Sequence, residues 1–203
     1  MARTNRQSEI TRNDILDAAE QLMAERGFQA TSIAEVCTIS KLPNGSVYWH
    51  FQNKNGLLAA VMERGSQRFF AGLPKPDELV GTPRERFDAW FESNTQMLAQ
   101  RPRFLRLHLS LCLLEETDAV VAEIVARVRA TAIGSLSRAM YPWVHELHGD
   151  AAEELSKELA AFMLATVDGA FIAQHTDGAD IERLLGRLHR SLVNEIEQPP
   201  ALG

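Results

Sequence analysis

Hydrophobic residues recur at intervals of three or four positions along almost the whole chain. This spacing places them on one face of an α-helix, whereas a strand would alternate apolar and polar residues, and no segment alternates strictly. The sequence therefore predicts an all-α fold. We expect helices from about Ser8 or Thr11 to Gly27, and over residues 32–38, 43–50, 53–70, 82–100, 102–114, 117–140, 150–175 and 180–196.

Capping residues set several of these boundaries. Thr11 begins a possible capping box, and Ser8 is an equally good start for the first helix. Residues 82–85 combine an N-cap Thr, a Pro at the first helical position and a capping-box Glu, which indicates a helix start. Glycines at 149 and 178 interrupt the later helices.

A connector divides the chain into two predicted domains. Residues 73–81 contain two prolines and a glycine and separate two helical regions. We expect an N-terminal three-helix domain over 1–53 and a larger helical domain over 54–197, with helix 53–70 as the connecting element. Residues 198–203 are expected to be a disordered tail.

Composition limits the class of protein. The 203 residues are 45% hydrophobic and 24% charged, which is ordinary for a globular chain. No apolar run approaches the roughly 18 residues of a membrane span, and the N-terminus lacks the apolar core of a signal peptide. We therefore expect a cytoplasmic protein with no membrane partner. Cys37 and Cys112 are too few for a disulfide framework or a zinc cluster.

The net charge of -6 conceals an uneven distribution. Residues 1–70 contain eight basic and seven acidic side chains, so the remaining residues carry all of the negative excess. This division permits a DNA-contacting N-terminal domain, because the charge of the contacting face matters more than the total.

Residues 38–51 read TISKLPNGSVYWHF and contain the densest group of aromatic side chains. Two short helices joined by a tight turn, after a longer supporting helix, match the dimensions of a helix-turn-helix. The second helix is too short to be stable alone, so one face must be anchored. Val47 and Phe51, four residues apart, are the expected anchor. The outward residues would be Asn44, Gly45, Ser46, Tyr48 and Trp49.

Five short pieces of the N-terminal region occur in a characteristic order. They are Ile15-Leu16-Asp17-Ala18-Ala19, Gly27-Phe28, Thr31-Ser32-Ile33, Gly45-Ser46-Val47-Tyr48-Trp49-His50-Phe51, and Lys54 followed by Gly56-Leu57-Leu58. From Arg12 to about Met62 the chain resembles the DNA-binding domain of the tetracycline-repressor-like (TetR) family of bacterial regulators. Between Thr31 and Phe51 the resemblance needs no insertion or deletion.

The resemblance implies that the second short helix recognises bases and that neighbouring residues contact phosphates. Hydroxyl, imidazole and ammonium groups suit phosphate oxygens, and amide or hydroxyl groups can bond base edges. The alternative is that the aromatic residues are core, Lys54 is a solvated charge and Thr31 is only a cap. The predicted DNA-binding residues are Thr31, Ser32, Asn44, Gly45, Ser46, Tyr48, Trp49, His50 and Lys54.

The turn departs from the pattern of the family. Lys41-Leu42-Pro43 stands where the family usually has Gly-Val-Ser. Leu42 can keep the apolar contact of the turn. Lys41 must either adopt a left-handed backbone or the turn must have a different geometry.

The larger domain carries polar groups on apolar helix faces. Asn94 interrupts one apolar stripe, and His108 and Cys112 share another. The alternative to a binding site is that each group bonds locally in a closed core, but the resemblance implies an effector cavity. The predicted lining is Trp90, Asn94, Met97, Phe104, His108, Cys112 and Phe171. Since no third ligand accompanies His108 and Cys112, we expect neither a metal nor a cofactor.

The last two predicted helices have more apolar surface than one buried face requires. An intramolecular core is one explanation. The resemblance implies instead that they pair with their symmetry mates in a four-helix dimer interface. The predicted interface residues are Leu159, Phe162, Thr166, Gly169, Ala170, Leu184 and Leu188.

Together these features predict a homodimeric transcriptional repressor that binds a palindromic DNA operator and is released by a small-molecule effector. The alternative is a helical small-molecule or haem carrier without operator-specific DNA binding. An enzyme is not expected, because no nucleophile-base grouping, phosphate-binding glycine loop or paired carboxylates are visible.

Overall fold

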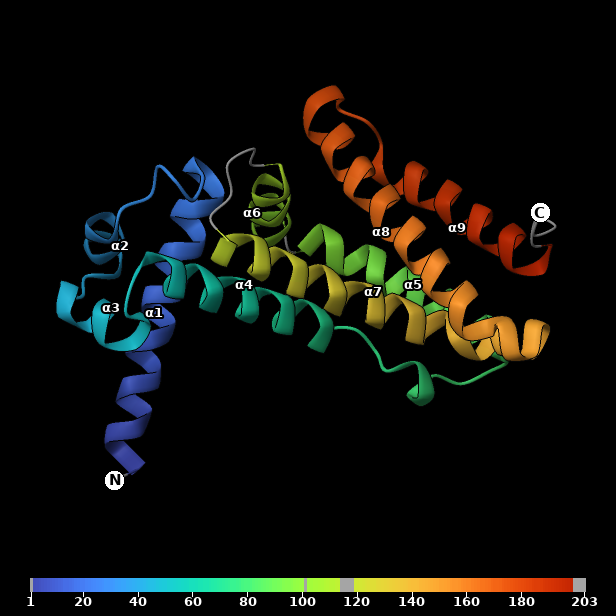
Figure 1. Ribbon diagram of the computed structural model, residues 1–203, viewed down its shortest axis with the longest axis horizontal. Coiled ribbons are helices and arrows are strands. Elements are labelled where there is room, and N and C mark those ends of the chain that lie inside the picture. Colours follow the sequence, from blue (N-terminus) through green and yellow to red (C-terminus); the bar gives the residue numbers. More distant parts are fainter. Residues whose placement is uncertain (1, 101, 114–118, 199–203) are drawn as a thin grey trace. The chain divides into compact units, whose positions relative to one another are not determined.

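The computed structural model describes residues 2–100, 102–113 and 119–198. The described residues form helices and short turns without a strand (Figure 1), so the predicted all-α fold is confirmed. The α-helices are α1 (Ala2–Arg26), α2 (Ile33–Ser40), α3 (Asn44–Phe51), α4 (Lys54–Ala71), α5 (Pro83–Gln100), α6 (Pro102–Cys112), α7 (Ala119–His148), α8 (Ala152–Asp177) and α9 (Ile181–Glu197), with 3-10 turns at Pro76–Glu78 and Gly149–Ala151.

The chain divides into two compact units that are not consecutive in sequence. Residues 1–69 and 101–128 form the N-terminal unit, and residues 70–100 and 129–203 form the C-terminal unit. The division expected at residue 53 stays a prediction. The expected tail from 198 falls almost wholly outside the described residues, of which Gln198 is the last and caps α9.

Two predicted helix boundaries were wrong. The first helix begins at Ala2 rather than at Ser8 or Thr11. Residues 2–10 contain neither Pro nor Gly, so nothing in the chain stops the helix from extending past the capping signal. Helix α7 continues to His148 instead of ending near 140, although Pro142 lies inside it. Trp143 and Val144 are buried, and their packing holds the turns that follow the proline.

The capping box predicted at Thr82 is confirmed, and a second capping box begins α2. Ser32 caps α2, its hydroxyl accepting from the Glu35 amide at 3.2 Å while the Glu35 carboxylate accepts from the Ser32 amide at 2.9 Å. The Ser32 hydroxyl, which donates to the Glu35 carboxylate at 2.7 Å, lowers the pKa of Glu35, and the Ser32 amide and the charge of Arg26 lower it further. Thr82 and Glu85 form the same reciprocal pair at the start of α5.

Helix α1 is the centre of the N-terminal unit, because α2, α3 and α6 all pack against it. Its apolar face is fully buried, including Ile15, Leu16, Leu22 and Met23. Helix α6 also approaches α4 closely. A Cβ atom at Gly65 would lie 2.3 Å from the Phe104 ring, so only glycine permits this contact.

A buried arginine joins α4 to α1. The Arg64 side chain is 9% exposed, and its guanidinium lies 2.7 Å from the Asp17 carboxylate and 2.9 Å from that of Glu20. It also donates to the Asn13 carbonyl at 3.3 Å. A buried charge without such partners costs about 3–5 kcal/mol, so these acidic groups are required by the position of Arg64.

Two further observations concern the described residues only. None of their helices combines the length and apolar character that crossing a membrane requires. None of their His, Cys, Asp and Glu side chains form a group of three that could hold a metal ion.

Both short helices of the helix-turn-helix end in a residue with positive φ that is not glycine. Lys41 follows α2 with φ 58° and ψ 30°, and Gln52 follows α3 with φ 64°. Of the two possibilities for the turn, Lys41 therefore adopts the left-handed backbone. The Leu42 amide donates to the Cys37 carbonyl at 3.2 Å and closes the helix end.

We predict that Lys41→Gly raises the free energy of unfolding by about 0.5–1 kcal/mol, because glycine has no Cβ to strain the left-handed backbone. Urea denaturation followed by circular dichroism measures this. Lys41→Ala is the control, since it removes the same charge but keeps the strain, and should give no gain. A loss of stability in Lys41→Gly would contradict the prediction.

Candidate nucleic-acid interface and helical groove

Helix α3 has one buried face and one exposed face. Val47 and Phe51 are 1% and 5% exposed and hold the helix in the N-terminal unit. Asn44 and Gly45 are exposed at its start, and Tyr48 and Trp49 are 52% and 73% exposed. The predicted anchor and the predicted outward residues other than Ser46 thus lie where the spacing of the sequence placed them. Ser46 is half-buried.

His50 packs against its aromatic neighbours on α3. Its ring meets the Trp49 ring edge-on, with centroids 4.5 Å apart, and the guanidinium of Arg12 lies 5.5 Å from the Phe51 centroid. Burial, and then the charge of Arg12, lowers the pKa of His50. The imidazole is therefore neutral at pH 7 and can both donate and accept a hydrogen bond.

Thr31 and Ser32 have different environments. Thr31 is 3% exposed, and its hydroxyl donates to the Gly27 carbonyl at 2.9 Å. Ser32 is exposed at the N-terminus of α2, and its hydroxyl lies 2.7 Å from the Glu35 carboxylate. Of this pair, only Ser32 lies at the surface in the position that suits a phosphate contact.

Lys54 is more than a solvated charge. Its ammonium donates to the Gln29 carbonyl at 3.0 Å and lies 4.5 Å from the centroid of the Phe28 ring. Burial lowers its pKa, and the charge of Glu35 partly opposes this. Lys54 thus ties the segment after α1 to the start of α4, while an ammonium can donate three hydrogen bonds in all.

The predicted effector residues fall in both units, and each group is described by itself. In the N-terminal unit, Phe104 and His108 are buried with ring centroids 6.2 Å apart, and the Cys112 Sγ lies 3.7 Å from the His108 Nε2. In the C-terminal unit, Trp90, Asn94 and Phe171 are buried, and Met97 is half-buried. Their role in effector binding stays a prediction.

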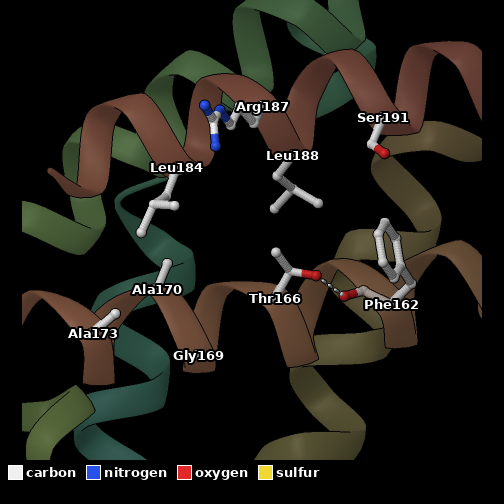
Figure 2. Close-up of a pocket in the computed structure, with 9 residues that line it drawn as sticks. All are labelled: Phe162, Thr166, Gly169, Ala170, Ala173, Leu184, Arg187, Leu188 and Ser191. Atoms are coloured by element: carbon white, nitrogen blue, oxygen red, sulfur yellow. Dashed lines mark hydrogen bonds between the residues drawn. The ribbon is translucent and has the colours of Figure 1, made fainter. Parts of the chain in front are cut away.

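An open groove of about 470 Å³ lies between α8 and α9. Figure 2 shows Leu184 and Leu188 of α9 pointing toward Thr166 and Ala170 of α8. The lining residues are Phe162, Thr166, Gly169, Ala170, Ala173, Leu184, Arg187, Leu188 and Ser191. All predicted interface residues except Leu159, which is 5% exposed, line this groove.

Sequence reasoning missed three of the lining residues and one N-terminal cation. Arg187 and Ser191 follow Leu184 by three and seven positions, and this helical spacing could have identified them. Ala173 follows Gly169 by four positions, so the same spacing could have identified it. Arg12 was considered only as the first residue of the family resemblance, and its contact with α3 depends on tertiary packing.

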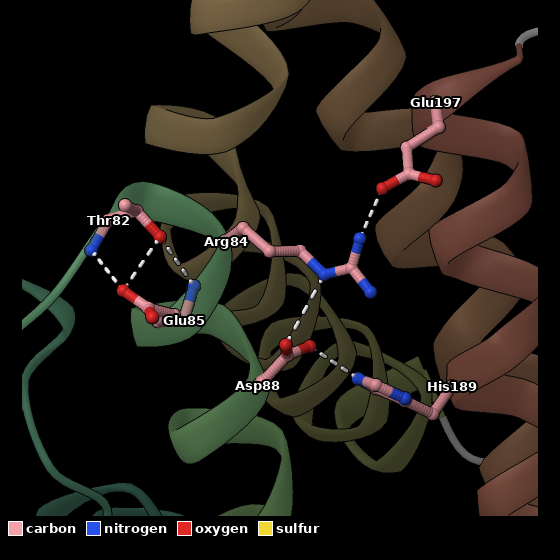
Figure 3. A network of polar contacts seen from close by, with 6 residues as sticks. All are labelled: Thr82, Arg84, Glu85, Asp88, His189 and Glu197. Atoms are coloured by element: carbon pink, nitrogen blue, oxygen red, sulfur yellow. Dashed lines mark hydrogen bonds and ion pairs between the residues drawn. The ribbon is translucent and has the colours of Figure 1, made fainter.

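A polar network fixes the opposite side of α9 to α5 (Figure 3). The His189 Nε2 lies 2.7 Å from the Asp88 Oδ1, and Arg84 pairs with both Asp88 and Glu197. The guanidinium of Arg84 also lies 4.7 Å from the centroid of Trp143. Because α9 is held by this side, the groove side remains available. No local signal joins Asp88 to His189, which lie 101 positions apart.

Comparisons with known proteins agree with the helix-turn-helix. Residues 15–61 match the family described as bacterial regulatory proteins, tetR family. The HTH-type transcriptional regulator TtgR of Pseudomonas putida is 34% identical over 61 residues, which cover 30% of this chain and 29% of TtgR. The match therefore spans less than a third of that relative.

Other similar proteins match over most of the chain. The HTH-type transcriptional repressor BepR of Brucella suis biovar 1 (strain 1330) is 27% identical over 199 residues, which cover 88% of this chain and 86% of BepR. The structure titled SmeT-Triclosan complex is 24% identical and has a TM-score of 0.71, covering 90% of this chain and 91% of that one. At this identity the second likeness concerns the fold.

The exposed α3 and the family match over residues 15–61 show that the N-terminal helix-turn-helix of this chain is that of the tetR family of bacterial regulatory proteins.

Proposed function

We propose that this protein is a transcriptional repressor that binds a palindromic DNA operator as a homodimer and is released by a small-molecule effector. The observation that carries the proposal is the exposed face of α3. Trp49 and Tyr48 are exposed although they are large aromatic residues, while Val47 and Phe51 on the other face are buried. The rings of Tyr48 and Trp49 become buried only when a partner covers this face of α3.

Duplex DNA is the partner that fits α3. The eight-residue helix is short and anchored on one face, as the major groove requires. Pro43 precedes it and makes no side-chain capping bond, so the N-cap side chain does not occupy the first amides of α3. Ser32, His50 and Lys54 add hydroxyl, imidazole and ammonium donors, the groups that position a protein on phosphates.

The groove between α8 and α9 supports the homodimer. Phe162 is 44% exposed at its edge, and the small residues Gly169 and Ala173 allow another helix to approach closely. The α8 and α9 helices of a second copy present the same surface, which is what a two-fold interface requires. Two copies would place their α3 helices in successive major grooves, about 34–36 Å apart.

Release by an effector follows from linkage. SmeT, a structural neighbour, is named in complex with triclosan. For this chain the proposed effector site uses the buried Trp90, Asn94 and Phe171 of the C-terminal unit. An effector that prefers a dimer with misplaced α3 helices weakens DNA binding, and DNA weakens effector binding by the same factor. BepR, named a repressor, supports repression as the mode of action.

We predict that Lys54→Gln weakens binding to every duplex and makes the plot of log affinity against log salt shallower by about 0.9 for each subunit. The reason is the loss of one phosphate contact per subunit. Fluorescence anisotropy over a range of salt concentrations measures the slope. Lys157→Gln, which removes an exposed charge from α8, is the matched control and should leave the slope unchanged. Equal slopes in wild type and Lys54→Gln would remove Lys54 from the interface.

We predict that Leu184→Glu weakens dimerisation by about 100-fold or more, because an unpaired charge would be buried between the two copies. Sedimentation equilibrium measures the dissociation constant. Arg190→Glu is the control, since it places a carboxylate at an exposed position of α9 outside the groove lining. An undiminished dimer in Leu184→Glu would show that the subunits associate through another surface.

A further inference from the structure

The outward surface of α3 has no formally charged side chain apart from a titratable histidine. Its sequence, NGSVYWHF, contains no Lys, Arg, Asp or Glu. In the major groove, guanine is most often bound by Arg or Lys through O6 and N7, and cytosine by a carboxylate through N4. The helix therefore lacks the usual partners of a G·C pair.

Three cations of the N-terminal unit have partners within the protein. Arg12 lies against the Phe51 ring, and the Lys54 ammonium bonds the Gln29 carbonyl. Arg26 pairs with Glu35 at 2.9 Å. His50 is half-buried and, with its lowered pKa, neutral at pH 7. Lys41 precedes α3 in the turn, a position that suits the phosphate backbone.

Trp49 and Gly45 form an apolar site on the exposed side of α3. They lie four residues apart, so they occupy the same face, and a helical side chain leans toward the preceding turn. A Cβ atom at Gly45 would meet nothing within 4 Å, so the backbone beside the Trp49 ring is open. The edge-on contact with His50 restricts how the indole can turn. Such a site accommodates a methyl group.

Asn44 supplies the matching polar group. It is exposed at the first position of α3, where the helix enters the groove. A side-chain amide can donate to N7 and accept from N6 of the same adenine, which no other base offers in that arrangement. Thymine is the base that presents a methyl group in the major groove.

We infer that α3 recognises A·T base pairs, with Trp49 contacting the C5-methyl group of thymine over Gly45 and Asn44 bonding the N6 and N7 edge of adenine. This inference rests on the proposed DNA-binding function. It names Trp49 and Asn44 as the residues that select A·T base pairs in each half-site of the operator.

The test begins with selection of bound duplexes from a random-sequence pool by the full-length protein. In the selected operator, each thymine of a half-site is replaced in turn by deoxyuridine, which lacks only the C5-methyl group. We expect one replacement in each half-site to weaken wild-type binding by about 4-fold, the effect of one buried methyl group. Trp49→Ala should bind both duplexes equally, whereas Tyr48→Phe should keep the wild-type preference.

Asn44 is tested in the same way with 7-deazaadenine, in which N7 is replaced by a carbon. Wild type should lose affinity at one adenine of each half-site, and Asn44→Ala should be indifferent to the replacement. Circular dichroism checks that the variants remain folded, which their exposed positions favour. If Trp49→Ala does not fold, the affinities of the wild-type protein for the thymine and deoxyuridine duplexes decide the test.

The outcomes separate the inference from the function on which it rests. A selected operator whose central half-site pairs are G·C, or wild-type binding that ignores every uracil and deazaadenine replacement, overturns the A·T assignment but keeps the DNA-binding function. Failure to enrich any duplex overturns both.

Discussion

The anchoring of α3 by Val47 and Phe51 is the contact on which the proposed function depends. A helix of eight residues is not stable alone in water, since nucleation costs more than so few hydrogen bonds return. Burial of each apolar anchor contributes about 1.5–3 kcal/mol. The anchor occupies one face, so the other face can remain exposed without loss of the helix.

The supports of α3 are held by charged groups at partly or fully buried positions. Arg64 ties α4 to α1 through Asp17 and Glu20, and Lys54 ties the start of α4 to the segment after α1. Because a buried charge loses its partners only at high cost, α1 and the start of α4 behave as one support within the N-terminal unit. Lys54 thereby combines a structural role with the proposed phosphate contact.

In the C-terminal unit, the two sides of α9 also have different roles, as the two faces of α3 do. Asp88 and Arg84 of α5 hold His189 and Glu197 on one side, and Leu184 and the rest of the groove lining occupy the other. The polar side is satisfied within the chain, whereas the apolar side retains surface that a second copy can cover. The proposed dimer therefore needs no rearrangement of the contacts between α5 and α9.

The sequence by itself determined the order of the helices, the capping at Thr82 and the two faces of α3, because these depend on spacing within a few residues. It also found most of the groove lining, since helical periodicity places those residues on one face. Only the tertiary structure decided that Thr31 is buried, that Lys54 and Arg12 lie on aromatic rings, and that α7 continues through Pro142. Each of these depends on partners distant in sequence, whose packing outweighs local propensity and leaves no local signal.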